Sequence, residues 1–316
     1  MFQFLVLSQL KFRVMKKLIV LLVVTICFSC KNETKSNGKL NIVTTTSMIT
    51  DLVQHIGGDY VNLQGLMGSG VDPHLYKASE GDVTKLVDAN VIFYNGLHLE
   101  GKLVEVFEKM VTATKTPIAL GEELDKSTLI GSDYFASNYD PHVWFDIEYF
   151  KQFAKKVTVV LSEKNPENAD NFKANETTYL AELDVLQAKI KATIETLPKE
   201  KRILVTAHDA FNYFGKAYDF EVVGLQGLST ATEAGVQDVQ KLSAFIIEKQ
   251  IKAIFVESSV PKRTIEALQA AVKSKGHDVE IGGTLYSDAL GTAGTTEGTY
   301  IGMFEYNVNT IVNALK

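Results

Sequence analysis

Cysteine is nearly absent from this sequence of 316 residues, which has only Cys27 and Cys30, both near the N-terminus. The body of the chain therefore has no disulfide, and its stability must come from packed cores, which this length allows. Clusters of lysine and arginine are also absent from the body, and the net charge is −6. That charge argues against nucleic acid as a partner, because binding a phosphate backbone needs a basic surface.

Three common signatures of enzymes and nucleotide-binding proteins are missing as well. Residues 291–302 are rich in glycine but lack the Gly-Lys-Ser/Thr ending of a phosphate-binding loop. The sequence contains neither Gly-x-Ser-x-Gly nor His-Glu-x-x-His, so it shows neither a serine-hydrolase elbow nor a zinc-protease helix.

The N-terminal segment 1–29 is predicted to be a signal peptide. Residues 15–17 form a short basic region, and residues 18–28 form an apolar stretch too short to cross a bilayer as a helix. A basic region of this kind normally begins at the initiator methionine. We therefore predict that Met15 is the true start and that residues 1–14 are a mis-assigned extension.

Cys30 follows a serine at the end of the apolar stretch, a pattern that resembles a bacterial lipobox. Cleavage there would leave Cys30 as an acylated first residue, with the polar segment 30–39 as a tether between lipid and fold. Cys27 and Phe28 are not usual lipobox residues, so a plain secretory signal is the alternative. We expect an exported protein, lipid-anchored to the membrane on the periplasmic or extracellular side.

From Leu40 onward, short β-branched stretches alternate with stretches whose apolar residues recur at helical spacing. Strands are predicted at 40–45, 61–67, 91–94, 116–120, 203–206, 221–226, 253–257 and 279–286. Helices are predicted at 48–56, 79–88, 99–111, 147–161, 209–216, 233–249, 261–274 and 299–315. This alternation predicts an α/β fold in which parallel sheets are flanked by helices.

One predicted helix is much longer than the others. It begins at the Asn-Pro pair 165–166, and no glycine or proline interrupts it before Pro198, which gives a length of roughly 45 Å. Its apolar residues form a single stripe, which argues against a coiled coil. The stripe consists of Phe172, Tyr179, Leu183, Leu186, Ile190, Ile194 and Leu197. We predict two α/β lobes, 40–147 and 199–316, joined by a helical linker, 148–198, that contains this rigid helix.

The tripeptide Asp-Pro-His occurs twice, at 72–74 and at 140–142, each time after a predicted strand or strand end. His208 and Asp288 also stand just past predicted strands, although Asp288 has the weakest support from spacing alone. Ligands of open parallel sheets bind outside the carboxyl ends of strands, so lobes that face each other would bring these side chains together. The predicted metal ligands are His74, His142, His208 and Asp288, a set suited to Zn²⁺ and also to Mn²⁺ or Fe²⁺.

Three acidic residues are candidates to support these ligands. Asp72 and Asp140 could accept the second ring N–H of a ligand histidine, which would raise its basicity. The alternative is that each aspartate only makes an Asx-turn. Glu257, at the end of a predicted strand, could support a ligand or anchor a helix start.

The other histidines are not expected to be ligands. His55 lies within a predicted helix and His277 in a polar stretch, and both are expected to be ordinary surface or core residues. His98 is expected on a cleft wall or at the surface.

Several stretches, together with both copies of Asp-Pro-His, resemble the metal-binding solute-binding proteins of ABC transporters, the TroA-like group. The stretches are 95–100 (NGLHLE), 207–214 (AHDAFNYF), 256–259 (VESS) and 285–291 (LYSDALG). The resemblance covers roughly residues 40–316. It implies two α/β lobes bridged by a rigid helix, a metal in the cleft, and ligand status for the four residues predicted above.

The position of His208 leaves the identity of the metal open. In the manganese-type branch of the family this position is usually glutamate, whereas the zinc-scavenging branch often has a histidine-rich loop before the second Asp-Pro-His. Residues 116–139 contain no histidine. Zinc and manganese therefore both fit the pattern, and intrinsic affinity would favour Zn²⁺.

The sequence thus predicts a monomeric extracytoplasmic receptor, not an enzyme, that captures Zn²⁺ or Mn²⁺ between two lobes and delivers it to an ABC permease. The long helix should limit release to small shifts of the second lobe, and acid should release the metal below about pH 6. The alternatives are a zinc-dependent hydrolase and a surface adhesion protein with a structural metal. A hydrolase would need an open coordination position, which Asp288 would fill.

Overall fold

The computed structural model describes residues 39–111, 116–133 and 135–316. The predicted signal peptide, the start at Met15 and the predicted lipidation of Cys30 lie outside these residues. Among the described helices, none combines the length and the apolar character that crossing a membrane requires. Residues Leu40–Lys316 form one compact unit, and the following paragraphs concern that unit.

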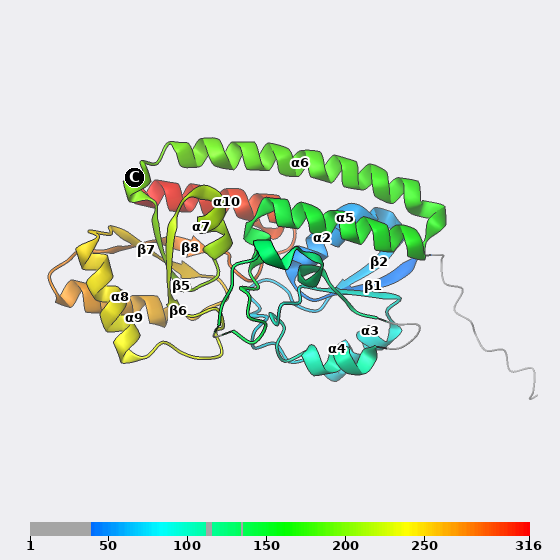
Figure 1. Ribbon diagram of the computed structural model, residues 1–316, viewed down its shortest axis with the longest axis horizontal. Coiled ribbons are helices and arrows are strands. Elements are labelled where there is room, and N and C mark those ends of the chain that lie inside the picture. The colour runs from blue at the N-terminus through cyan, green and yellow to red at the C-terminus, as the bar shows by residue number, and fades with distance from the viewer. Residues whose placement is uncertain (1–38, 112–115, 134) are drawn as a thin grey trace, which may run out of the picture. The chain divides into compact units, whose positions relative to one another are not determined.

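The first lobe is built on a parallel sheet of four strands in the order β2-β1-β3-β4. The strands are β1 (Leu40–Thr44), β2 (Val61–Gly65), β3 (Val91–Tyr94) and β4 (Ile118–Ala119). The helices are α2 (Ser47–Gly57), α3 (Glu80–Asp88), α4 (Val104–Met110) and α5 (Ile147–Lys164). Figure 1 shows α3 and α4 on one side of the sheet and α2 and α5 on the other. The chain leaves β1 for β2 on one side and returns to β3 on the other, so a topological switch point lies between β1 and β3.

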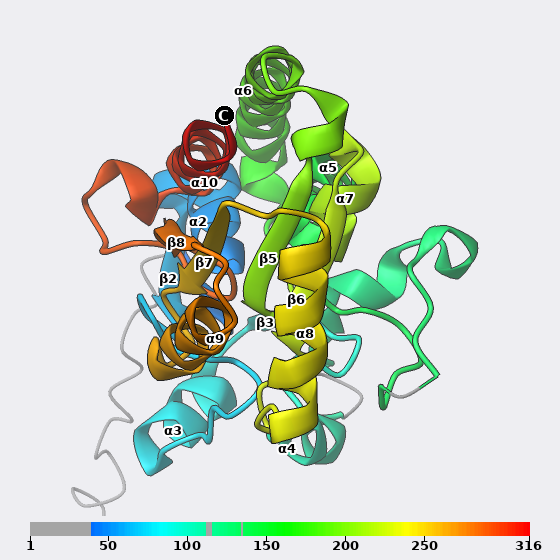
Figure 2. The ribbon, with the colours of Figure 1, turned by 90° about the vertical axis from the view of Figure 1, so that its left-hand side faces the viewer.

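The second lobe contains two parallel strand pairs. The pairs are β5 (Ile203–His208) with β6 (Glu221–Gln226), and β7 (Ala253–Glu257) with β8 (Glu280–Leu285). β5 and β7 lie side by side, so the two pairs form one layer. The helices are α7 (Asn212–Tyr218), α8 (Val236–Glu248), α9 (Arg263–Ser274) and α10 (Tyr300–Leu315). In Figure 2, α8 and α9 cover the side of this layer away from α10.

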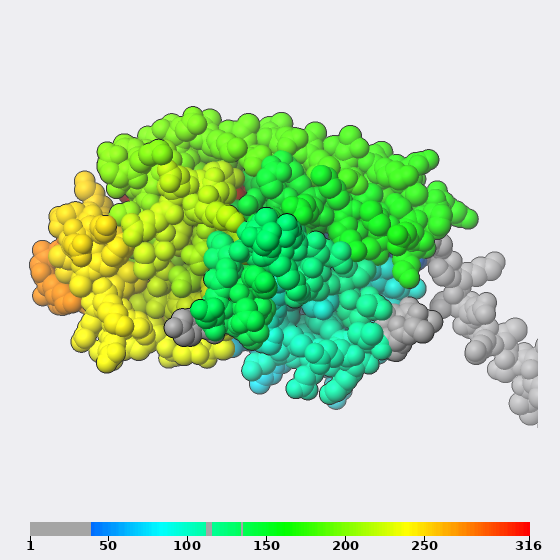
Figure 3. Space-filling view, viewed as in Figure 1, coloured from blue at the N-terminus to red at the C-terminus, as the bar shows by residue number. Residues whose placement is uncertain are grey.

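The predicted long helix consists of a 3₁₀ turn, Pro166–Asn168, followed by α6, Ala169–Glu195. Every residue of the predicted apolar stripe is buried, from Phe172 to Leu197. The helix packs against α2 and α5 of the first lobe and against α10 of the second. Figure 3 shows its side chains running along both lobes. The bridging helix is therefore held along its length by both halves of the molecule.

The largest hydrophobic cluster of the described residues extends through both lobes. It contains buried residues of the first lobe, of α6 and of the second lobe, whereas a smaller cluster lies within each lobe alone. At its centre Phe150 of α5 stacks on Tyr300 of α10 with ring centroids 3.8 Å apart, and Phe145 lies 4.4 Å from Phe211. Because protein cores are packed at crystal-like density, a wide hinge motion would have to separate these aromatic contacts.

Several predicted boundaries need correction. The helix predicted at 99–111 begins only at Val104, because Leu97 and His98 have positive φ angles of 50° and 62° and turn the chain first. The strand predicted at 61–67 ends at Gly65, and the strand predicted at 116–120 is only Ile118–Ala119. The long helix is also shorter than predicted, about 40 Å for its α-helical part.

The context predicted for the two tripeptides is also only partly right. The second Asp-Pro-His does not directly follow a strand of the sheet; in its described part, the long connection before it contains the 3₁₀ turns Leu120–Glu123 and Lys126–Thr128 and an isolated bridge between Gly131 and Tyr139. The first lies in the loop between β2 and α3, well past the strand end. The other elements agree with prediction to within a few residues. The lobe boundaries 40–147, 148–198 and 199–316 stay predictions, since the shared core leaves no gap that would define them.

The buried stripe of α6 should carry much of the stability of the bridge. We expect Leu183→Ala, at a fully buried position, to lower the free energy of unfolding by about 2–5 kcal/mol, because it leaves a cavity. Val185→Ala, at a position 69% exposed on the same helix, should change it by less than about 0.5 kcal/mol. Urea denaturation measures both values, and equal effects would contradict the assignment of the buried face.

Candidate metal centre

The four predicted ligands meet at one point of the fold. His74 comes from the loop between β2 and α3, and His142 stands just before the 3₁₀ turn Val143–Phe145. His208 is the last residue of β5, and Asp288 follows β8. One nitrogen or carboxylate oxygen of each residue lies within 4.8 Å of the corresponding atoms of the other three. Each lobe thus contributes two members of the cluster.

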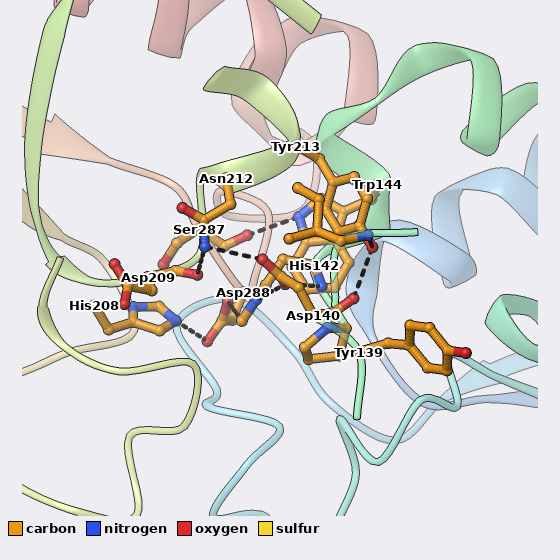
Figure 4. Close-up of polar contacts among 12 residues, drawn as sticks. Tyr139, Asp140, His142, Trp144, His208, Asp209, Asn212, Tyr213, Ser287 and Asp288 are labelled. Carbon is orange, nitrogen blue, oxygen red and sulfur yellow. Dashed lines mark hydrogen bonds and ion pairs between the residues drawn. The ribbon is translucent and has the colours of Figure 1, made fainter. Parts of the chain in front are cut away.

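The spacing of the four side chains fits a small cation. Nε2 of His74 lies 3.3 Å from Nε2 of His142, and Nε2 of His208 lies 3.2 Å from Oδ2 of Asp288. The remaining carboxylate contacts, to Nε2 of His74 and of His142, are both 3.7 Å. Ligands about 2.0–2.2 Å from a tetrahedral Zn²⁺ would be about 3.3–3.6 Å apart. Figure 4 shows Asp288 between His208 and His142.

Burial makes this cluster costly without a cation. The exposed fraction is 4% for His74, 1% for Asp288 and zero for the other two. Both carboxylate oxygens of Asp288 and Nε2 of His208 have no hydrogen-bond partner within the described residues. Buried polar atoms lose their hydration, and the ion-pair contacts of Asp288 with the histidines compensate only part of that loss. A divalent cation among these atoms would supply the missing interaction.

Asp140 fixes the orientation of the His142 ring. Its Oδ1 accepts the main-chain N–H of His142 at 2.9 Å and lies 2.7 Å from Nδ1 of the same residue. Because Nδ1–H is used in this bond, Nε2 carries the free lone pair that faces the cluster. Asp140 therefore contacts the histidine ring as well as its backbone.

Glu257 holds His208 in a similar way from β7. Its Oε1 accepts the main-chain N–H of His208 at 2.9 Å, and its Oε2 lies 2.6 Å from Nδ1. The second contact has the geometry of an ion pair rather than of a linear hydrogen bond. The carboxylate adds negative charge behind the imidazole, which would make that imidazole a stronger ligand.

Asp72 behaves differently from Asp140 although the tripeptides are identical. Its Oδ1 accepts the main-chain N–H of His74 at 2.8 Å, which is the Asx-turn alternative. Its Oδ2 accepts the hydroxyl of Thr230 at 2.5 Å. Both oxygens are thus engaged away from the ring of His74.

Burial and the neighbouring charges shift the pKa values of the cluster residues in opposite directions. Burial lowers the pKa of His74 to about 3. Burial alone would also lower the pKa of His208, but Glu257 and Asp288 outweigh it and raise that pKa well above its usual range. Burial alone would raise the pKa of Asp288, but the histidines hold it below its usual range. Without a cation, the cluster therefore pairs a charged Asp288 with a protonated His208.

Sequence reasoning missed a second layer of positioning residues in the first lobe. The buried carboxylate of Glu100 accepts the hydroxyl of Thr45 at 2.6 Å and the main-chain N–H of Asn95 at 2.8 Å. The amide of Asn95 donates to the carbonyl of Pro141 at 3.0 Å. These contacts hold the second tripeptide at the switch point between β1 and β3. The NGLHLE stretch contained the signal, since Asn95 and Glu100 are its first and last residues.

Two other contacts join the second tripeptide region to the second lobe. The indole N–H of Trp144 donates to the carbonyl of Ser287 at 3.1 Å, and the amide of Asn212 donates to Oδ2 of Asp140 at 3.0 Å (Figure 4). Asn212 lies in the AHDAFNYF stretch. Its role could not be read from spacing, because it depends on how the lobes face each other.

The other histidines lie outside the cluster. Nδ1 of His55 is 2.8 Å from the carbonyl of Asp51, and its ring stacks on Tyr179 of α6. Nε2 of His277 is 2.9 Å from the carbonyl of Ile251. His98 occupies the turn before α4, where its ring faces the edge of Phe135.

Two parallel-sheet lobes, a long bridging helix and three histidines with one aspartate between the lobes are the features of a metal-binding solute-binding protein. The chain belongs to the family described as "ZnuA: Zinc-uptake complex component A periplasmic", which it matches over residues 42–314.

Relatives of the chain carry names of both zinc and manganese proteins. "Zinc-binding protein TroA" of Treponema pallidum is 47% identical over 283 residues, 90% of this chain and 91% of its own length. Its solved structure superimposes with a TM-score of 0.85 at 48% identity, covering 88% of this chain and 99% of that one. "Manganese-binding lipoprotein MntA" of Bacillus subtilis is 48% identical over 278 residues, 88% of this chain and 90% of its own. "Manganese ABC transporter substrate-binding lipoprotein PsaA" of Streptococcus pneumoniae is 32% identical over 315 residues, which cover 95% of this chain and 99% of its own length.

Replacement of Glu257 should show how strongly its negative charge raises the pKa of His208. We expect Glu257→Gln, which keeps the main-chain hydrogen bond, to lower the pKa of His208 in the chelator-treated protein, because one of two nearby carboxylates is removed. An NMR titration of the histidine rings measures this pKa. Glu233→Gln, at an exposed residue, should leave it unchanged. An unaltered pKa in Glu257→Gln would contradict the role given to this carboxylate.

Proposed function

We propose that this protein is an extracytoplasmic receptor that binds a divalent metal cation, Zn²⁺ or Mn²⁺, as cargo and delivers it to an ABC permease. The ligands would be His74, His142, His208 and Asp288. One observation carries the proposal: two side chains from each lobe bury their ligand atoms within 4.8 Å of one another, and the oxygens of Asp288 have no other hydrogen-bond partner among the described residues. The names of the relatives support the same reading.

The donor set favours zinc in intrinsic affinity. Three imidazoles and one carboxylate suit Zn²⁺, which sits above Mn²⁺ in the order of complex stability. Two relatives of nearly equal identity are nevertheless named for different metals. Metal supply in the cell would then decide which cation fills the site.

A carrier explains the site better than a catalyst. Four protein ligands would complete a tetrahedral shell, whereas a zinc hydrolase keeps one position for water or substrate. The site is also buried, with no member more than 4% exposed. Release would require the two lobes to shift slightly, so that His208 and Asp288 move away from the first-lobe histidines.

We also propose that the receptor is a monomer held at the membrane by a lipid on Cys30, on the periplasmic or extracellular side. The serine-cysteine pair at the end of the apolar stretch supports the anchor, as do relatives named as lipoproteins. Residues 31–39 would then be the tether between the lipid and β1.

Loss of one proposed ligand should abolish tight cargo binding without unfolding the protein. We expect His208→Ala to weaken Zn²⁺ binding by at least about 100-fold, because a nitrogen ligand and its supporting Glu257 contact are both lost. Competition titrations with a fluorescent chelator, run with Zn²⁺ and with Mn²⁺, measure the effect. His277→Ala, outside the cluster, is the matched control and should bind as the wild type does. Retention of wild-type affinity by His208→Ala would reject the site.

Acid should compete with the cargo at His208. Because the pKa of His208 is raised, this residue carries a proton at neutral pH in the empty site, and the cation must displace it. From about pH 7.5 down to about pH 5.5, we expect the apparent Kd for Zn²⁺ to rise about tenfold per pH unit. Binding isotherms over this range measure how steeply the apparent Kd rises as the pH falls. In Glu257→Gln, this rise should begin at a lower pH. A Kd independent of pH would contradict proton competition at His208.

A further inference from the structure

The first tripeptide contacts the opposite lobe through its aspartate. While Oδ1 of Asp72 accepts the main-chain N–H of His74, its Oδ2 accepts the hydroxyl of Thr230. Thr230 belongs to the second lobe, in the connection between β6 and α8, and is only 9% exposed. The same carboxylate therefore touches the loop of one proposed ligand and a loop of the opposite lobe.

In the second tripeptide, the two carboxylate oxygens of Asp140 also have different partners, one in each lobe. Oδ1 of Asp140 is used by His142, and Oδ2 accepts the side-chain amide of Asn212, the first residue of α7 in the second lobe. The main-chain carbonyl of Asp140 also accepts the hydroxyl of Tyr213 at 3.0 Å. Figure 4 shows Asn212 placed between Asp140 and the residues around His208.

This arrangement is more than an Asx-turn requires. An Asx-turn uses one carboxylate oxygen, and the second is free to face water. Here the second oxygen of each aspartate is committed to a single neutral donor of the other lobe. A carboxylate is planar, and the proline that follows each aspartate restricts the turn. A shift of either histidine would therefore change the geometry of the bond between the lobes.

We propose that Asp72 and Asp140 couple cargo binding to lobe closure, with Thr230 and Asn212 as the positioning residues on the second lobe. A bound cation would fix the two first-lobe histidines, and through them the aspartates, in the position that accepts both donors. Loss of the cargo would loosen both bonds. By linkage, the bonds would in turn slow the escape of the cation. This inference rests on the proposed function.

The dissociation rate of Zn²⁺ tests the coupling. Thr230→Val removes the hydroxyl at nearly constant shape, and Asn212→Leu removes the amide. Each should raise the rate of Zn²⁺ transfer to excess chelator, followed by stopped-flow fluorescence, by roughly tenfold, since each loses a hydrogen bond to a carboxylate. Thr230→Ser keeps the hydroxyl and should restore the wild-type rate.

Two control variants separate coupling from general loosening. Ser229→Ala removes a hydroxyl of the same loop that bonds only to the main chain of Ala231 among the contacts described. Lys216→Gln removes a different bond between the lobes, to the carbonyl of Thr128. Neither should change the dissociation rate of Zn²⁺ by more than about twofold. A rise in Lys216→Gln equal to that in Thr230→Val would overturn the inference, because any contact between the lobes would then suffice.

Hydrogen exchange supplies a readout that a purely structural role would not give. In the wild type, saturating Zn²⁺ should protect residues 227–235 and the start of α7. In Thr230→Val, the protection of residues 227–235 by Zn²⁺ should be lost while the cation stays bound. Should this variant fail to fold, Asn212→Leu tests the second bond between the lobes, the one from Asn212 to Asp140.

The outcomes also separate this inference from the proposed function. A wild-type protein that binds no Zn²⁺ or Mn²⁺ would overturn both. Tight binding by the wild type, with unchanged rates in Thr230→Val and Asn212→Leu, would overturn the coupling alone.

Discussion

The structure depends on one costly arrangement, the burial of a carboxylate and three imidazoles whose lone pairs point at one another. Asp288 has no hydrogen-bond partner among the described residues, and its negative charge is balanced only by the histidines around it. Such a group is stable in a protein interior only when neighbouring structure holds it in place and a cation or proton compensates its charge. Asp140 and Glu257 hold two of the histidines around Asp288 in place. The proposed cargo meets the second condition, and a proton on His208 replaces it in the empty site.

The two lobes can present this arrangement because they share a core. The stacked pair Phe150 and Tyr300 and the buried stripe of α6 belong to both halves, so neither lobe can turn away as a rigid body without exposing aromatic surface. Small shifts at the cleft remain available, because the contacts there are single hydrogen bonds such as those to Thr230 and Asn212. A receptor of this kind would respond to its cargo by making or losing a few polar contacts rather than by opening widely.

The prediction of the fold from sequence succeeded where the physics is local. The apolar stripe of α6 and the helix predicted at 79–88 depend on residues a few positions apart, and both are present; the second is α3, which Ser79 and Asp82 cap by bonding each other's backbone. The start of α4 was predicted wrongly because a distant contact decides it. The carboxylate of Glu100 binds Thr45 and the backbone of Asn95, and this holds residues 96–98 in a left-handed turn where periodicity alone favours helix. The second Asp-Pro-His likewise depends on a distant contact: its position after turns rather than after a strand is accompanied by the bond from Asn95 to Pro141.

By itself, the sequence determined the chemical types in the cluster and the repeat of Asp-Pro-His, because residue identity fixes which atoms can donate lone pairs and proline fixes the turn. The tertiary structure decided what each repeat does. Oδ1 of Asp140 contacts the ring of its histidine as well as the main chain, whereas Oδ1 of Asp72 bonds to the main chain of His74 and both of its oxygens are engaged away from that ring, although the two tripeptides are identical. In both repeats, Oδ2 accepts a donor that the opposite lobe supplies. Those donors lie 72 residues away in the chain for Asp140 and 158 for Asp72, far beyond what local sequence can specify.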